Sequence, residues 1–415
     1  MHPGPRRLCE NTGLDPHHPN CPVAARRPPA AAHSGGPRSA CPAAADGADA
    51  NVPEVKQTPI PFLTAALLAL ALGAAPGAAA AAPRLSGAGA IFPFPLYATW
   101  LRQLARDPTI RNAYNSTGVR VDYAAESSDA GVRALIAGDV DFAASDRSID
   151  DDEAEETERG IIALPMTAGS VALAYNLRGV GALRLPRAVY PQIFAGTITR
   201  WDDPQIAAAN PDAPLPEQDI VVVVRADAAR ATDVLTAHLS AIDAAFRRDI
   251  GRSRAPEWPQ NARFLHEPKN DGVAAAIAGT PGAIGYLDHG YARLAGWTQI
   301  ALLENKAGRY VAPDLETGMA ALADVPFPDA PLPSGAPDLR AQDRDPAADN
   351  AYPITAMTWM LFYATGYTGA RLTAVRDLID YCISDAAQGQ APALGYVRLP
   401  DVVLERVREA AGVIQ

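Results

Sequence analysis

From Pro83 to the end of the chain, short apolar runs alternate with segments whose apolar residues recur at helical spacing. Strands and helices that alternate in this way indicate α/β units built around mostly parallel sheets. The chain shows no internal repeat at the periods typical of solenoid proteins. We expect strands at residues 84–86, 119–123, 142–144, 170–175 and 220–224, and helices at residues 95–105, 130–137, 232–239, 272–278, 373–383 and 402–411.

Two stretches depart from this pattern. Residues 1–58 are rich in Pro, Ala, Arg, His and Gly and have no apolar period. Such a leader cannot bury enough apolar surface to offset the entropy lost on ordering it, so we expect it to be disordered. Residues 324–350 are rich in Pro, Asp and Ala and also lack a period. We expect them to form a surface excursion before the last block of the chain.

The segment that follows the leader has the parts of a secretory signal peptide. A lysine precedes an unbroken apolar run, Phe62–Leu72, and small residues occupy Gly73–Ala82. A membrane span needs about 20 apolar residues, and this run is shorter. We therefore assign residues 59–82 to a cleaved signal peptide, which places the mature protein in the periplasm.

A signal peptide normally opens a chain, whereas this one begins at residue 59. Two explanations are open. Either the start is misassigned and translation begins at Val52 or Val55 through a non-Met codon, or residues 1–58 are a genuine disordered extension.

The cysteines agree with export. Cys9, Cys21 and Cys41 all lie in the leader, so only Cys382 remains after cleavage and no internal disulfide is possible. No cysteine follows the apolar run directly, which argues against a lipid-anchored form. The leader cysteines and histidines do not have the spacing of a zinc site, and we expect neither a metal nor a cofactor.

The charge of the chain limits its partners. With a formal net charge of −11 and a pI of about 5.1, the protein lacks the basic character that a nucleic-acid backbone requires. A small anion remains a possible ligand, because a positive pocket can lie inside an acidic shell.

Three segments indicate where an anion would bind. Each ends a strand or turn and then begins a helix with small or hydroxyl residues, namely GAGAIFPFP (87–95), ESSDAGV (126–132) and RADAARAT (225–232). A helix N-terminus presents free N–H groups and the positive end of the helix dipole. Three that converge would form an anion site with little side-chain charge.

From about Leu85 to the C-terminus, the chain resembles the periplasmic phosphate-binding proteins of ABC-type phosphate transporters. Seven stretches carry the resemblance in collinear order: SGAGAIFPFPLYATW, GVRALIAGDVDFAASD, GTITRWDDPQIAAANP, VVVVRADAARATDVLTAHL, NDGVAAAIAGTPGAIGYLDHGYA, YPITAMTWMLF and LPDVVLERVREAAGVI. The resemblance implies a two-lobed α/β fold of the periplasmic-binding-protein type (type II-like), with two hinge crossovers and a ligand cleft between the lobes.

The resemblance also implies where the lobes divide. The crossovers fall near Thr167–Tyr175 and Tyr352–Phe362. One lobe then comprises residues 83–165 plus 354–415, and the other comprises residues 169–350.

Four binding positions follow for the first lobe. The family's Thr-Phe pair is Ile91-Phe92 here, and the serine that donates its hydroxyl and N–H is Ser128. Asp146 matches an aspartate that accepts the proton of hydrogen phosphate. A carboxylate in that position pairs with a P–OH group but repels fully ionised sulfate.

In the second lobe, Arg225 matches an arginine that forks onto the phosphate oxygens, and Asp227 matches the aspartate that orients it. The family continues with Gly-Ser-Gly-Thr, whereas this chain has Ala228–Ala231. Ala229 and Ala231, like Ile91, therefore lack a hydroxyl donor. Backbone N–H groups of Ala229, Arg230 and Ala231 are left to complete the cage, and the φ of a lost glycine would strain Arg230.

Two side chains could compensate for the lost donors. Arg230 could bring a second guanidinium into the cleft, and Thr232 could turn inward. A surface position for Arg230 is the alternative.

The resemblance implies a monomeric receptor that captures inorganic phosphate and delivers it to the membrane permease and ATPase of an ABC transporter. The alternative keeps the fold but binds another oxyanion, or serves secretion, adhesion or signalling with a degenerate site. An enzyme is not expected, because the chain has neither a nucleophile elbow nor an HExxH motif.

Overall fold

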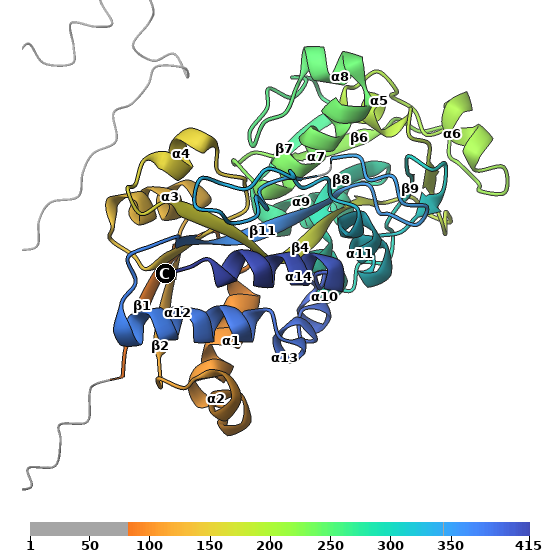
Figure 1. Cartoon of the computed structure of the whole chain (residues 1–415). Helices are drawn as coiled ribbons and strands as arrows, with labels where there is room; N and C mark the ends of the chain where they lie inside the picture. Colours follow the sequence, from red (N-terminus) through yellow and green to blue (C-terminus); the bar gives the residue numbers. More distant parts are fainter. Residues whose placement is uncertain (1–81, 343) are drawn as a thin grey trace, which may run out of the picture. The chain divides into compact units, whose positions relative to one another are not determined.

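The computed structural model describes residues 82–342 and 344–415 (Figure 1). The leader and almost all of the predicted signal peptide, with Cys9, Cys21 and Cys41, lie outside the described residues. Within the described part of the chain, no helix is long and apolar enough to cross a membrane.

Eight strands form one mixed sheet, in the order β2-β1-β3-β11-β4-β8-β6-β7. Their bounds are β1 Arg84–Gly89, β2 Arg120–Ala125, β3 Phe142–Ser145, β4 Ile161–Tyr175, β6 Val221–Arg225, β7 Phe264–Glu267, β8 Ala283–Asp288 and β11 Thr355–Tyr363. A smaller sheet has the order β10-β9-β5 and consists of β5 Arg184–Leu185, β9 Leu302–Glu304 and β10 Tyr310–Val311.

Helices connect most of the strands, as the alternating pattern predicts. They are α1 Phe94–Arg106, α2 Pro108–Tyr114, α3 Ser128–Ala137, α4 Asp151–Glu155, α5 Tyr190–Phe194, α6 Pro204–Ala209, α7 Arg230–Ile242, α8 Ala244–Asp249, α9 Lys269–Gly279, α10 His289–Leu294, α11 Leu315–Ala323, α12 Gly369–Cys382, α13 Asp385–Gln388 and α14 Asp401–Gly412. A 3-10 turn covers Pro392–Leu394.

The sheet is parallel at its two ends and antiparallel in its middle. β1 pairs in parallel with β2 and β3, and β6 pairs in parallel with β7 and β8. β11 runs antiparallel to both β3 and β4, and β4 runs antiparallel to β8. The expectation of mostly parallel sheets therefore holds for the ends and is wrong for the centre, where two long strands run side by side in opposite directions (Figure 1).

The central strand β4 also connects two hydrophobic cores. Its residues Ile161–Leu164, Met166 and Ala168 belong to a first core cluster, which includes residues of α1, α12 and α14. Val171, Leu173 and Tyr175 belong to a second cluster, which includes α7 and β8. One strand thus passes from one core into the other. The lobe boundaries expected from the sequence stay a prediction.

The Pro-rich stretch at residues 324–350, before β11, is more buried than predicted. Ala336 and Leu339 are fully buried in the first core cluster. The indole Nε1 of Trp359 on β11 donates a hydrogen bond of 2.8 Å to the carbonyl of Leu339. The segment therefore covers the central strands and is held by backbone contacts that its composition does not reveal.

Two glycines bring β1, β3 and α3 close together. Gly89 ends β1 with φ +138°, and a Cβ there would lie 2.1 Å from the carbonyl oxygen of Ala144 on β3. A Cβ on Gly131, in the first turn of α3, would lie 2.5 Å from the Cα of Gly89. Glycine at both positions lets the start of α3 lie against the end of β1. The first turn of α3 therefore lies beside the end of β1, next to the short connection that leads into α1.

Candidate functional site

Three helix starts meet at one cleft of about 760 Å³. Ile91 and Phe92 precede α1, Ser127 and Ser128 begin α3, and residues 229–231 begin α7. Phe92 packs against the first core cluster and Ala231 belongs to the second, so the cleft lies between the two cores. All eight predicted phosphate-binding residues line it, as does Asp227: Ile91, Phe92, Ser128, Asp146, Arg225, Asp227, Ala229, Arg230 and Ala231.

Two of the three helices begin without a side-chain cap. Pro93 precedes α1 and Ala229 precedes α7, and neither side chain accepts a hydrogen bond from the helix. The N–H groups of a first helical turn have no partner inside the helix. The start of α7 therefore offers the backbone N–H groups of Arg230 and Ala231 and a positive dipole end to the cleft, while the N–H of Ala229 donates to the carbonyl of Arg254 at 3.0 Å. The start of α1 offers less, because the N–H of Phe94 donates to the carbonyl of Ile91 at 3.1 Å and Pro95 has no N–H.

The two serines at the start of α3 have different hydrogen-bond partners. Ser127 is the N-cap, and its hydroxyl accepts a hydrogen bond from the N–H of Ala130 at 3.1 Å. Ser128 is buried, and its hydroxyl accepts from the N–H of Asp146 at 3.0 Å. The proton of the Ser128 hydroxyl is left to donate to a ligand in the cleft.

Asp146 follows β3 and is buried at the wall of the cleft. Its Oδ1 has no hydrogen-bond partner among the described residues. Burial raises the pKa of this carboxyl group to about 6, and the positive charge of Arg230 partly offsets the rise. A buried carboxyl oxygen without a partner can accept a hydrogen bond from a ligand that carries a proton.

Asp227 fixes the orientation of the Arg225 guanidinium through two hydrogen bonds. Its Nε donates to Asp227 Oδ1 at 2.8 Å and its Nη2 donates to Oδ2 at 2.5 Å. Asp227 also accepts from the N–H of Lys269 at 2.9 Å. The hydrogen bonds from Arg225 lower the pKa of Asp227 to about 2. The Arg225 side chain is 9% exposed, so the guanidinium is fixed and largely desolvated at the cleft wall.

Arg230 points into the protein, and the alternative of a surface position is wrong. Its Nη2 donates to the carbonyls of Gly169 on β4 and Ala356 on β11, at 3.2 and 2.8 Å, and its Nη1 lies 3.3 Å from Asp288 Oδ1. The guanidinium carbon lies 3.9 Å from the ring centroid of Phe92. Arg230 therefore joins α7 to both central strands beneath the cleft.

Two further expectations need correction. Arg230 is not strained, because it is the first residue of α7 and Lys269 is the one described non-glycine residue with positive φ. Thr232 does not line the cleft. Its hydroxyl is buried and shares a 2.7 Å hydrogen bond with the hydroxyl of Tyr286, since the third residue of α7 faces the core cluster.

Several cleft residues were not predicted from the sequence. Asn270 donates to Asp288 Oδ2 at 3.0 Å, and Asp288 in turn contacts Arg230. The hydroxyl of Tyr396 donates to the carbonyl of Phe92 at 2.7 Å. Arg254 and Lys269 add positive charge to the lining. These residues come from loops and helix starts far apart in the sequence, and no local pattern marks them.

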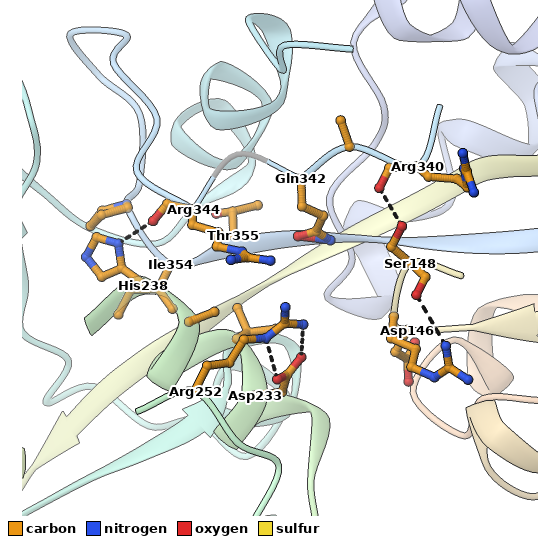
Figure 2. A pocket seen from close by; sticks show the side chains of 15 residues that line it. Asp146, Ser148, Asp233, His238, Arg252, Arg340, Gln342, Arg344, Ile354 and Thr355 are labelled. Atoms are coloured by element: carbon orange, nitrogen blue, oxygen red, sulfur yellow. Dashed lines mark hydrogen bonds and ion pairs between the residues drawn. The ribbon is translucent and has the colours of Figure 1, made fainter. Parts of the chain in front are cut away.

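A second, smaller pocket of about 240 Å³ shares Asp146 with the cleft (Figure 2). Three of its arginines are paired, Arg252 within the pocket and Arg147 and Arg340 with carboxylates outside it. Arg252 forks onto Asp233 at 2.8 Å for both contacts, and Nδ1 of His238 hydrogen-bonds to the carbonyl of Arg344 at 2.7 Å. The larger cleft, with the uncapped start of α7 and the fixed Arg225, is the better candidate for a ligand site.

The chain matches the family model described as "PBP superfamily domain" over residues 74–386. It is 31% identical over 334 residues to the phosphate-binding protein PstS of Pasteurella multocida, a match that covers 79% of this chain and 89% of the relative. It is 30% identical to the phosphate-binding protein PstS of Xylella fastidiosa (strain Temecula1), covering 78% of this chain and 84% of that protein.

Solved structures show the same fold. A DING protein superposes with a TM-score of 0.58 at 22% identity, covering 78% of this chain and 93% of the other. A phosphate-binding protein from Stenotrophomonas maltophilia superposes with a TM-score of 0.53 at 18% identity, covering 79% of this chain and 93% of the other.

Proposed function

The chain belongs to the PBP superfamily and, within it, to the PstS phosphate-binding proteins, and from that premise we propose that it captures phosphate in the cleft for import by an ABC transporter. One observation carries the proposal. The uncapped start of α7, the fixed fork of Arg225 and the buried, unpartnered carboxyl oxygen of Asp146 all face the same cleft.

Each group has a distinct task in this proposal. Arg225, oriented by Asp227, holds two phosphate oxygens through charge-assisted hydrogen bonds. Ser128 and the N–H groups at the helix starts donate to the remaining oxygens. Asp146 accepts the hydrogen bond of a P–OH group and so distinguishes phosphate from sulfate.

The two central strands supply the hinge. We propose that residues 83–165 plus 354–415 form one lobe and residues 169–350 the other, so that β4 and β11 cross between them. The change of core cluster along β4 supports this division. A ligand that contacts α1 and α3 on one side and α7 on the other would favour the closed arrangement of the lobes.

We further propose that the protein is exported through the predicted signal peptide, acts outside the cytoplasm as a monomer, and passes phosphate to a membrane permease and its ATPase. We also propose that it is not an enzyme. Neither histidine nor cysteine is among the described residues that line the cleft, so no such side chain lies beside Ser128 to act as a general base.

Calorimetric titration tests the proposed function. The protein would first be unfolded and refolded to remove any anion already bound. We expect inorganic phosphate to saturate one site with a Kd tighter than about 1 mM, which corresponds to about 4 kcal/mol of binding free energy. No heat and no thermal stabilisation at millimolar phosphate would instead favour a family member with a lapsed site, used in secretion, adhesion or signalling.

The pKa of Asp146 predicts a pH dependence for sulfate. Because that pKa is about 6, the carboxylate is ionised at pH 8 and repels sulfate, whereas at pH 5 it is mostly protonated and can donate a hydrogen bond instead. We expect sulfate, which is a dianion at both pH values, to bind at least about tenfold more tightly at pH 5, on the scale of one hydrogen bond to a charged group. Calorimetry at the two pH values measures the ratio.

The variant Asp146→Asn is the control for this effect, because an amide does not titrate. We expect it to bind sulfate at pH 8 about as well as the unmodified protein does at pH 5, with little further change on acidification. Equal sulfate affinity of the unmodified protein at both pH values would contradict the selective role of Asp146.

A further inference from the structure

We propose that Arg254 binds the phosphate directly, as a second guanidinium beside Arg225, and so takes the place of hydroxyl donors that the cleft lacks. The inference rests on the proposed function, because it assumes that the cleft binds phosphate. It adds a binding residue that was not predicted from the sequence.

The start of α7 offers an anion few side-chain donors. Ala229 and Ala231 line the cleft there, and their methyl groups cannot donate a hydrogen bond. Arg225 already donates from Nε and Nη2 to Asp227. A phosphate ion at this position therefore needs donors beyond these residues and the backbone N–H groups of the helix start.

Arg254 has donors to supply. It lies in the loop between α8 and β7 and lines the cleft. Its guanidinium makes no hydrogen bond or ion pair with any residue that the structure describes, so all of its N–H donors are available to a ligand. The other arginines of the lining differ in this respect, because Arg225 is paired with Asp227 and Arg230 with Asp288.

The main chain holds Arg254 beside the proposed anion position. Its carbonyl accepts a hydrogen bond of 3.0 Å from the N–H of Ala229, which is the N-cap residue of α7. The next two residues, Arg230 and Ala231, have the N–H groups that α7 presents to the cleft. The loop that carries Arg254 is therefore attached to the helix start at which we place the anion.

The charge of Arg254 also acts across the cleft. Burial raises the pKa of Asp146 to about 6, and the positive charge of Arg230 and, to a lesser degree, that of Arg254 offset part of the rise. Arg254 belongs to the proposed second lobe and Asp146 to the first. An ion bound at Asp146 is therefore within the electrostatic reach of Arg254 as well.

Calorimetric titration of phosphate into Arg254→Ala tests the inference on the full chain, after unfolding and refolding to remove bound anion. We expect the variant to bind phosphate at least about tenfold more weakly, on the scale of one hydrogen bond between charged groups. Arg254→Lys keeps the charge but not the planar fork, and should recover part of the loss. Because the side chain has no partner among the described residues, the urea midpoint of Arg254→Ala without phosphate should be unchanged.

Arg248→Ala is the matched control for charge. It removes an exposed arginine of the neighbouring helix α8, changes the net charge equally and lies outside the cleft lining. It should bind phosphate as the unmodified protein does. A similar loss of affinity in both variants would indicate a general effect of net charge and would contradict a direct contact by Arg254.

A second background separates phosphate from the acidic partner that the cleft offers Arg254. Glu126 is exposed and lines the cleft just before α3, so it could attract Arg254 when the lobes close. If Arg254 contacts phosphate, Arg254→Ala should lose about tenfold in affinity in the Glu126→Gln background too. A loss below about threefold in that background would show that Arg254 acts through Glu126, and the inference would be wrong.

The outcomes separate the inference from the proposed function. If the unmodified protein binds phosphate and Arg254→Ala binds it within about threefold of the same affinity, the inference is wrong while the phosphate receptor stands. If the unmodified protein binds no phosphate, the proposed function itself fails.

Discussion

Replacing Arg225 with alanine is expected to weaken phosphate binding by at least about 100-fold. The guanidinium forks onto Asp227, is 9% exposed and faces the cleft. Each hydrogen bond from a charged group to the ligand contributes about 1.5–3 kcal/mol, so losing two costs about 3 kcal/mol or more, and 1.4 kcal/mol is a tenfold change in affinity. Calorimetric titration of phosphate measures the loss.

Two control variants make this result specific. Arg225→Lys keeps the positive charge but loses the planar fork, so we expect it to recover only part of the affinity. Arg248→Ala removes an arginine whose side chain is 72% exposed and pairs with the neighbouring Asp249. It changes the net charge equally and should bind phosphate normally. Phosphate affinity of Arg225→Ala within threefold of the unmodified protein would mean that the anion does not contact Arg225.

The strands β1, β2, β3 and β6 were predicted from the sequence, whereas β7, β8, β11 and the first half of β4 were not. Strands such as β1, β3 and β6 are short apolar runs bounded by turn residues, which is a clear local signal. All 15 residues of β4 and all nine of β11 are buried. Buried strands lose the polar alternation that marks a half-exposed strand. Only the second half of β4 was predicted, and the antiparallel pairing of β4 with β11 links segments about 190 residues apart.

In the candidate site, too, local features could be predicted from the sequence and long-range contacts could not. Local features, namely the helix starts and the Arg225–Asp227 pair, were available from short motifs and lie at the cleft as expected. The contacts of Arg230 with Asp288, Gly169 and Ala356 span between 58 and 126 residues along the chain. Whether an arginine at a helix start faces solvent or the interior depends on such distant partners, which no local motif reveals.

Arg230→Ala is expected to destabilise the fold more than any other single arginine substitution in the cleft. The arginine is 7% exposed. Its removal leaves Asp288 without its positive partner and leaves the carbonyls of Gly169 and Ala356 without the guanidinium donor. Breaking a buried ion pair from one side typically costs about 3–5 kcal/mol, and the lost contact with the Phe92 ring adds to this. Chemical denaturation measures the change in unfolding free energy.

The position of Arg230 allows a second readout that a general packing defect would not give. The same guanidinium contacts β4 and β11, the two strands proposed as the hinge. Its loss should therefore raise amide hydrogen exchange along these strands more than in α12 or α14. Arg248→Ala, at the exposed arginine that pairs with Asp249, again serves as the control. We expect it to change the free energy of unfolding by less than about 0.5 kcal/mol. A loss below about 1 kcal/mol for Arg230→Ala, or exchange raised evenly over the molecule, would show that Arg230 does not tie the hinge strands together.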